Sequence, residues 1–188
     1  SPDELNGDLL LMESRNSVRN ITAHLLEKGC TLPGFMGDIG YAQSNRERYE
    51  GFCQALMDAG KTPNPSLCLT TPLGIDSYRE EIDSFLSSLS RMHDVARRDV
   101  PPKAIINFVR GWDYTMLQAL HSAGLRVPED VAVSGFDNNI EDLLAENLTT
   151  VQVFNEELGS RLALQILYRI KYPHTPHEVT YLESKVLY

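Results

Sequence analysis

The chain lacks the features that define several protein classes. No apolar run approaches the roughly 18 residues that a helix needs to cross a membrane, and no signal-like segment opens the sequence. Basic residues are scarce, with 17 Lys and Arg against 26 Asp and Glu, for a net charge of −9. An excess of negative charge disfavours binding to the phosphate backbone of a nucleic acid. The sequence therefore indicates neither a membrane protein nor a segment that itself binds nucleic acid.

Cysteine and histidine are also sparse. The three cysteines are widely spaced and lie in apolar surroundings, at Cys30, Cys53 and Cys68. Buried, reduced thiols in a cytoplasmic protein explain them better than a disulfide framework. His174 and His177 lie in a proline-rich turn, where a two-histidine metal site is the minor alternative. We expect no metal and no cofactor.

Catalytic motifs are missing as well. The sequence contains no nucleophile elbow, no Walker motif and no dinucleotide-binding glycine pattern. One acidic cluster occurs at helical spacing, at Asp76, Glu80, Glu81 and Asp83. A solvated helix face is the simplest interpretation of that cluster. We therefore predict that the chain is not an enzyme.

The sequence does contain a regular alternation of strand and helix patterns. Short apolar runs predict strands at 8–12, 32–36, 67–69, 104–109, 131–133, 149–153, 179–182 and 186–188. Amphipathic runs between them predict helices, among them 113–123 and 155–172, and Gly29 and Gly60 are expected to end two others. This alternation predicts an α/β fold with a mainly parallel sheet between layers of helices.

Polar residues in front of the helical runs predict how the helices begin. Segment 14–17 is expected to form a turn and cap the first helix, and Ser44 or Asn45 to cap the second. Ser77 and Glu80 have the spacing of a capping box.

The most informative segment runs from residue 124 to residue 138. Gly124 closes a helix, Pro128 lies in a polar turn, and the apolar run 131–133 forms a buried strand. Asp137 therefore comes at the carboxyl end of a parallel strand, where open α/β sheets bind ligands. A carboxylate at that place can accept short, strong hydrogen bonds from polar hydrogens of a ligand.

Six segments, in order along the chain, resemble the LacI/GalR (lac repressor) family of bacterial transcription regulators. They are residues 24–29, 48–60, 117–124, 127–137, 148–151 and 157–159. The resemblance implies a periplasmic-binding-protein-like type I fold, a three-layer αβα architecture of two lobes joined by three crossing segments, with the ligand in the cleft between them. The C-terminal lobe is expected to be complete and the N-terminal lobe partial.

Placing the chain on this plan divides it into four parts. Residues 1–31 belong to the N-terminal lobe, and 32–151 form the C-terminal effector-binding lobe. Residues 152–178 return to the N-terminal lobe, and 179–188 form a crossing tail of the C-terminal lobe. We expect the helix-turn-helix headpiece and the first strands of the N-terminal lobe to be absent, so that the chain is a fragment.

The resemblance also implies a function. The chain would sense a small-molecule effector, carbohydrate-like in character, and ligand-linked hinge closure would alter the DNA affinity of a homodimer. DNA would be bound only through the absent headpiece. A sugar-binding protein of a transport system shares the fold and is the alternative, which a secretory signal ahead of Ser1 would favour. An α/β enzyme with the same sheet topology is a more distant alternative.

Two residues in the resembling segments carry the implied ligand contacts. Asp137 occupies the position of an aspartate that accepts hydrogen bonds from ligand, and a cap for segment 138–144 is its structural alternative. Arg48 matches an arginine that contacts ligand from the start of its helix, and its guanidinium can bind hydroxyls or a carboxylate in a bidentate manner. A surface charge among charged neighbours is the alternative for Arg48.

Three further residues complete the candidate ligand site. Asn16 falls where the family often has a polar contact on the N-terminal lobe, and a cap or turn role is the simpler interpretation of this residue. Arg110 and Trp112 offer a cation and an indole in the loop after a predicted strand. Trp112 is a stacking surface for a sugar or ring in one interpretation, and a lobe-packing or dimer-face aromatic in the other.

Several positions depart from the family pattern. Residues 109–110 are Val-Arg where the family usually carries Asn-Asp, and Pro72 stands where an aromatic commonly stacks on ligand. Val153 occupies the place of a frequent polar contact. These departures leave the identity of the ligand open.

Overall fold

The computed structural model describes residues 7–71, 80, 83–87, 103–108, 113–136 and 149–187, with the backbone alone described for 103–108 and 113–117. Most of these residues form a body built on a six-stranded sheet. The strands are β2 (Cys30–Met36), β3 (Cys68–Leu69), β4 (Lys103–Phe108), β5 (Val131–Phe136), β6 (Thr149–Gln152) and β8 (Lys185–Leu187). Their order is β3-β2-β4-β5-β6-β8, and every pair is parallel except β6 with β8.

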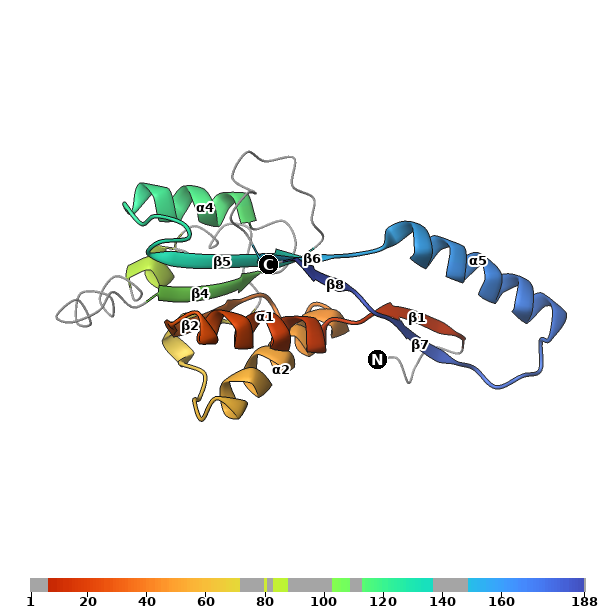
Figure 1. Cartoon of the computed structure of the whole chain (residues 1–188). Coiled ribbons are helices and arrows are strands. Elements are labelled where there is room, and N and C mark those ends of the chain that lie inside the picture. The colour runs from red at the N-terminus through yellow and green to blue at the C-terminus, as the bar shows by residue number, and fades with distance from the viewer. Residues whose placement is uncertain are drawn as a thin grey trace.

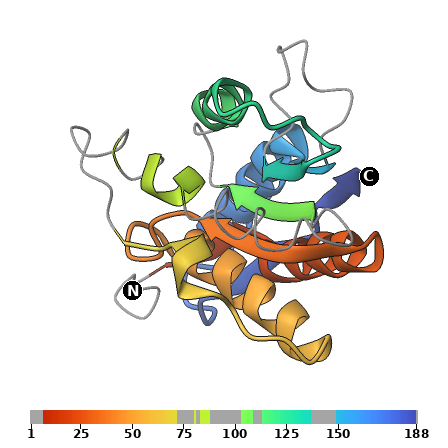
Figure 2. The same ribbon diagram turned by 90° about the vertical axis from the view of Figure 1, so that its left-hand side faces the viewer.

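Helices cover both faces of this sheet. α1 (Arg15–Glu27) and α2 (Gln43–Asp58) lie on one face, and α4 (Asp113–Ser122) lies on the other (Figures 1 and 2). The apolar side chains of β5 point alternately to the two faces, as the pleat of a strand requires. Val131 and Val133 pack in one core cluster, and Ala132 and Phe136 pack in the other. The predicted three-layer α/β fold is thus confirmed.

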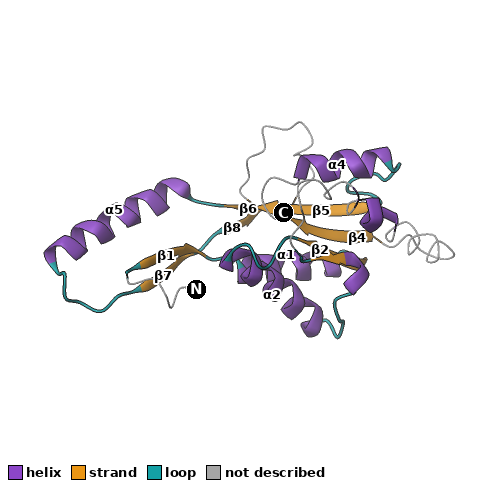
Figure 3. Ribbon diagram, turned by 180° about the vertical axis from the view of Figure 1, so that it is seen from behind, coloured by secondary structure: helices purple, strands orange, loops and turns teal. Residues whose placement is uncertain are grey.

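A smaller part of the chain extends from the body as an arm. It consists of β1 (Leu9–Met12), α5 (Asn155–Lys171) and β7 (Val179–Leu182), and β1 pairs with β7 in a parallel two-stranded sheet. Figures 1 and 3 show α5 running alongside these two strands, away from the body. Three short segments, 13–14, 153–154 and 183–184, join the arm to the body.

This packing differs from the expected division of the chain at two points. α1 was expected in the N-terminal lobe, but its apolar residues Val18 and Ile21 pack in one cluster with Phe35 and Phe52 of the body. The tail 179–188 was expected to belong to one lobe, but β7 pairs with β1 in the arm while β8 pairs with β6 in the body. We therefore propose lobe boundaries at the three connecting segments rather than near Thr31.

The ends of the helices follow the predicted glycines, but their starts do not follow the predicted caps. Gly29, Gly60 and Gly124 end their helices with φ of +90°, +68° and +73°, a region that favours glycine. Ser14 makes no capping bond with its side chain. Instead, the Glu13 carboxylate accepts the N–H groups of Asn16 and Ser17 at 2.5 and 3.1 Å, because it reaches the first turn from outside the helix.

The predicted cap of α2 is also wrong. The helix begins after Ala42, and Ser44 and Asn45 lie inside its first turn. The Asn45 side chain donates a hydrogen bond to the carbonyl of Asp38 at 2.9 Å, so it holds the preceding loop instead of the helix end. The expected capping serine of the next helix, Ser77, lies outside the described residues.

The strands and remaining helices agree with expectation to within a few residues. Leu67, predicted in a strand, ends a short 3-10 helix at Pro65–Leu67, and only Cys68–Leu69 pairs with β2. β5 continues to Phe136 where the apolar run predicted 131–133. Residues 83–87 are helical, and Phe85 and Leu86 are buried in the core on the α4 side.

The side chain of Asp8 forms hydrogen bonds with several elements of the arm. Its carboxylate accepts hydrogen bonds from Gln165 at 2.8 Å and from Arg169 Nε at 2.9 Å, and a further bond from Arg169 Nη2. It also accepts the backbone N–H of Glu178 at 3.0 Å. These donors, Arg169 foremost, hold the pKa of Asp8 well below its ordinary value. One side chain thus connects the start of β1, the second half of α5 and the entry to β7.

Replacing Asp8 with asparagine is expected to loosen the arm, because the amide loses the charge that Arg169 pairs with. Amides of β1 and β7 should exchange faster with solvent in Asp8→Asn, as measured by hydrogen exchange. The folded pKa lies below the ordinary value of 3.8. The stabilisation is therefore complete above pH 4 or so and is lost as the pH falls below it.

Asp58→Asn is the matched control, since Asp58 pairs with Arg19 on the body, where both side chains are more than two-fifths exposed. Surface pairs of this kind contribute little. Equal exchange of the arm amides in the two variants would contradict the role of Asp8.

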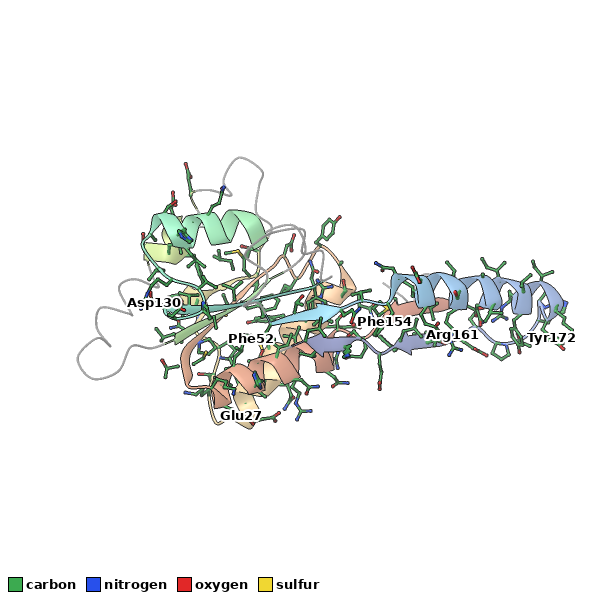
Figure 4. The ribbon with its side chains drawn as sticks, turned by 45° about the horizontal axis from the view of Figure 1, so that its top comes forward. Glu27, Phe52, Asp130, Phe154, Arg161 and Tyr172 are labelled. Atoms are coloured by element: carbon green, nitrogen blue, oxygen red, sulfur yellow. The ribbon has the colours of Figure 1, made fainter. Side chains whose placement is uncertain are left out.

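The arm leaves an apolar surface exposed. α5 has no buried residue. Large apolar side chains of α5 and β7 are solvent-exposed, at Leu162, Leu164, Ile166, Leu167, Ile170, Val179 and Tyr181. Figure 4 shows α5 running from the junction near Phe154, through Arg161, to its far end near Tyr172, with its side chains pointing away from the body that contains Phe52. Exposed apolar patches of this kind are typical of interaction surfaces.

No helix in the described part of the chain is long and apolar enough to span a membrane.

Candidate functional site

A cavity of about 200 Å³ lies where the arm meets the body. Its walls come from β1, the segment after it, the first two turns of α2, the last residue of β5 and the segment after β6. The lining residues are Leu11, Met12, Ser14, Gln43, Ser44, Glu47, Arg48, Phe136 and Val153. The carboxyl end of β5 borders this space, as expected for a ligand crevice in an open parallel sheet.

Arg48, which the sequence predicted to contact ligand, lines the cavity from the body side. Its guanidinium carbon lies 3.8 Å from the centroid of the Phe136 ring. A flat cation on an aromatic face is held in a fixed orientation, and such contacts are stabilising. The helix that carries Arg48 is itself fixed, because its Phe52 and Leu56 side chains are fully buried in the core of the body.

Glu47 is the charged lining residue that sequence reasoning missed. Its side chain is only 8% exposed. Gln43, one turn earlier in α2, donates to Glu47 Oε1 at 2.8 Å, and the Tyr181 hydroxyl of β7 donates to the same oxygen at 3.2 Å. Burial and the nearby Glu47 carboxylate raise the pKa of Tyr181, which keeps this hydroxyl protonated as a donor at neutral pH.

The Glu47–Tyr181 hydrogen bond also connects the two parts of the molecule. Glu47 belongs to α2 of the body, and Tyr181 belongs to β7 of the arm. The sequence contained one signal for Glu47, since Gln43 lies four residues earlier and Arg48 follows directly. The distant partner, Tyr181, could not be read from local spacing.

The other predicted site residues are placed differently. Asn16 lies on the exposed side of α1, outside the lining of the cavity. Asp137, Arg110 and Trp112 lie outside the described residues, although Phe136, which directly precedes Asp137, lines the cavity. These assignments stay predictions.

The departures from the family pattern are only partly visible. Val153 lines the cavity as an apolar wall, and Pro72 and Val109 lie outside the described residues. The described lining therefore combines an apolar wall with polar groups that come chiefly from α2.

None of the cysteines and histidines within the described ranges lines this cavity. Cys30 is buried and Cys68 half-buried, and burial raises the pKa of the Cys68 thiol to about 11. A thiol with such a pKa is protonated at neutral pH and weakly reactive. His177 Nδ1 lies 3.6 Å from the Asp8 carboxylate. Within the described residues, no group of three or more potential ligands could hold a metal ion.

The fold and the cavity together define a class of protein. A body with a parallel sheet, a second sheet reached by three crossing segments, and a cavity where they meet form the architecture of a periplasmic-binding-type ligand receptor. The chain belongs to the periplasmic binding protein-like domain family, whose sequence pattern matches residues 22–187.

Similar proteins that are named as transcription regulators support this family assignment. The HTH-type transcriptional repressor PurR of Aliivibrio salmonicida is 27% identical over 188 residues, which cover 99% of this chain and 53% of the repressor. The HTH-type transcriptional regulator DegA of Bacillus subtilis is 29% identical over 155 residues, which cover 81% of this chain and 42% of the regulator. The resemblance to the effector-binding region of the LacI/GalR family is thereby confirmed.

A solved structure confirms the fold. The complex of the transcriptional regulator CelR with cellobiose superposes with a TM-score of 0.76 at 23% identity, covering 97% of this chain and 53% of CelR. The chain thus spans about half the length of the relatives it matches, since it covers 53% of PurR and 42% of DegA.

Proposed function

We propose that the chain is the effector-sensing region of a LacI/GalR-type transcription regulator and that a small molecule binds in the cavity between body and arm. The observation that carries the proposal is that both parts line one cavity: Leu11 and Met12 come from the arm, and Arg48 and Phe136 come from the body. A ligand there touches both parts at once.

The mechanism we propose is ligand-linked movement of the arm against the body. Three short segments join the two parts, and these segments are the natural hinges. A ligand that contacts both parts binds more tightly to one relative arrangement and so shifts the population toward it. In the longer protein, this change would be transmitted to a DNA-binding headpiece.

A carbohydrate-like ligand is the class we favour. The cavity offers a carboxylate acceptor in Glu47, a guanidinium donor in Arg48 and an aromatic ring in Phe136. Hydroxyl groups of a sugar can donate to the first, accept from the second, and leave C–H surface for the third. The CelR relative was solved with cellobiose, which makes this disaccharide a reasonable first probe.

The relatives support a longer protein around this region. We propose that it contains a helix-turn-helix headpiece and the rest of the N-terminal lobe, forms a homodimer, and acts in the cytoplasm. The rest of that lobe would cover the exposed apolar face of α5 and β7. A sugar-binding protein of a transport system remains the alternative, and the relatives, which are regulators and not enzymes, favour the first function.

The function is tested on the longer protein with its own upstream DNA. A ligand drawn from a panel of mono- and disaccharides, cellobiose included, is expected to change DNA affinity by about 5- to 150-fold, the usual range of allosteric coupling. Fluorescence anisotropy of labelled DNA measures the change. Tight sugar binding without any DNA binding would support the transport alternative instead.

A further inference from the structure

Glu47 is the buried acid of the cavity. It is 8% exposed, and Arg48 is the other charged residue among the described lining residues. The hydrogen bonds that the described residues donate to its carboxylate, from Gln43 and Tyr181, both end on one oxygen, Oε1. The carboxylate is therefore held from two sides through a single oxygen.

The surroundings of Glu47 would otherwise attract an anion. Gln43 and Ser44 form the first turn of α2, and the N–H groups and dipole at the start of a long helix favour negative charge. The Arg48 guanidinium adds a positive charge with a geometry that suits carboxylate or phosphate. Glu47 places a fixed negative charge among these groups.

We propose that Glu47 determines the specificity of the cavity: it rejects anionic ligands and accepts a hydrogen bond, on Oε2, from a hydroxyl or amine of a neutral or cationic ligand. This inference rests on the proposed ligand-binding function. Repulsion between a bound anion and a carboxylate a few ångströms away is strong, because burial weakens the screening by water. A hydroxyl or ammonium group instead gains a charge-assisted hydrogen bond.

Glu47→Gln tests the proposal, because the amide keeps an oxygen that can accept from Gln43 and Tyr181 and removes only the charge. The probe is inorganic sulfate, titrated calorimetrically into the full chain at constant ionic strength. Sulfate should bind Glu47→Gln at least about tenfold more tightly than the unmodified protein, since one close repulsion is removed. Adding Arg48→Met should abolish the gain.

Glu50→Gln is the matched control. Glu50 lies on the same helix, is exposed, and pairs with Arg15 at the surface, so its replacement changes the net charge equally without altering the cavity. Sulfate affinity of Glu50→Gln should equal that of the unmodified protein. The proposal is overturned if Glu47→Gln binds sulfate no better than Glu50→Gln, or if the unmodified protein binds it equally well.

The outcome is independent of DNA. Should the longer protein fail to respond to any sugar at its DNA site, the proposed function fails, while the sulfate titration still reports on Glu47. Should the titration fail while sugars alter DNA binding, the function stands and Glu47 does not set specificity.

Discussion

Replacing Gly51 with alanine is expected to lower the free energy of unfolding by roughly 2–3 kcal/mol. Gly51 is buried where α2 crosses α1, and a Cβ atom there would lie 2.1 Å from the carbonyl oxygen of Arg15. Backbone cannot rotate away as a side chain can, so the two helices must separate. Separation would open the core that Phe52 and Ile21 fill from these helices. Urea unfolding followed by circular dichroism measures the change.

Gly159→Ala is the matched control for this prediction. Gly159 also lies within a helix, α5, but nothing stands within 4 Å of the Cβ that alanine would add. Without a clash, alanine should stabilise the helix by about 0.5–1 kcal/mol, because it loses less backbone entropy than glycine. Equal effects at the two sites would mean that the close approach of α1 and α2 does not decide the stability of the body.

Replacing Asp137 with alanine is expected to weaken ligand binding by about 1.5–3 kcal/mol, or roughly 10- to 150-fold. Asp137 follows Phe136, the last residue of β5, and Phe136 lines the cavity. The proposed carboxylate at this strand end would accept a charge-assisted hydrogen bond that alanine cannot replace. Isothermal titration of the longer protein with the sugar that it binds measures the loss.

The control for this second prediction is Glu129→Ala. Glu129 is an exposed acid two residues before β5 begins, at the opposite end of the strand from the cavity. Its removal should change ligand affinity by less than about 0.5 kcal/mol, the usual limit for surface substitutions. A loss below the same limit in Asp137→Ala would remove Asp137 from the site.

Local pattern predicted most of the elements because their signals lie within a few residues. The apolar run before Phe136 and the glycines at 29, 60 and 124 mark a strand and three helix ends. Such features depend on backbone conformation and on burial of one face, and both can be inferred from short windows. The caps were predicted less well, because Glu13 and Asn45 act through side chains whose reach depends on the path of the preceding loop.

The candidate site was predicted only in part. Arg48 could be recognised from its segment, and it lines the cavity. Glu47 was overlooked because one of its hydrogen-bond donors is Tyr181, a residue 134 positions away in another part of the chain. The packing of α1 with the body could not be predicted for a similar reason, since its apolar face fits either lobe until its packing partners are known.

The sequence by itself determined the parallel α/β architecture and the family, and it predicted a ligand crevice at the end of β5, where the structure has a cavity. The periodic pattern of apolar residues and the strand-end motif are local properties, so they can be recognised without knowing which distant residues are in contact. Only the tertiary structure showed that α1 packs against the body and that Glu47 lines the cavity beside Arg48. It also showed that β7 pairs with β1 in the arm, whereas β8 pairs with β6 in the body. Each of these depends on which distant surfaces meet, and no local pattern specifies that.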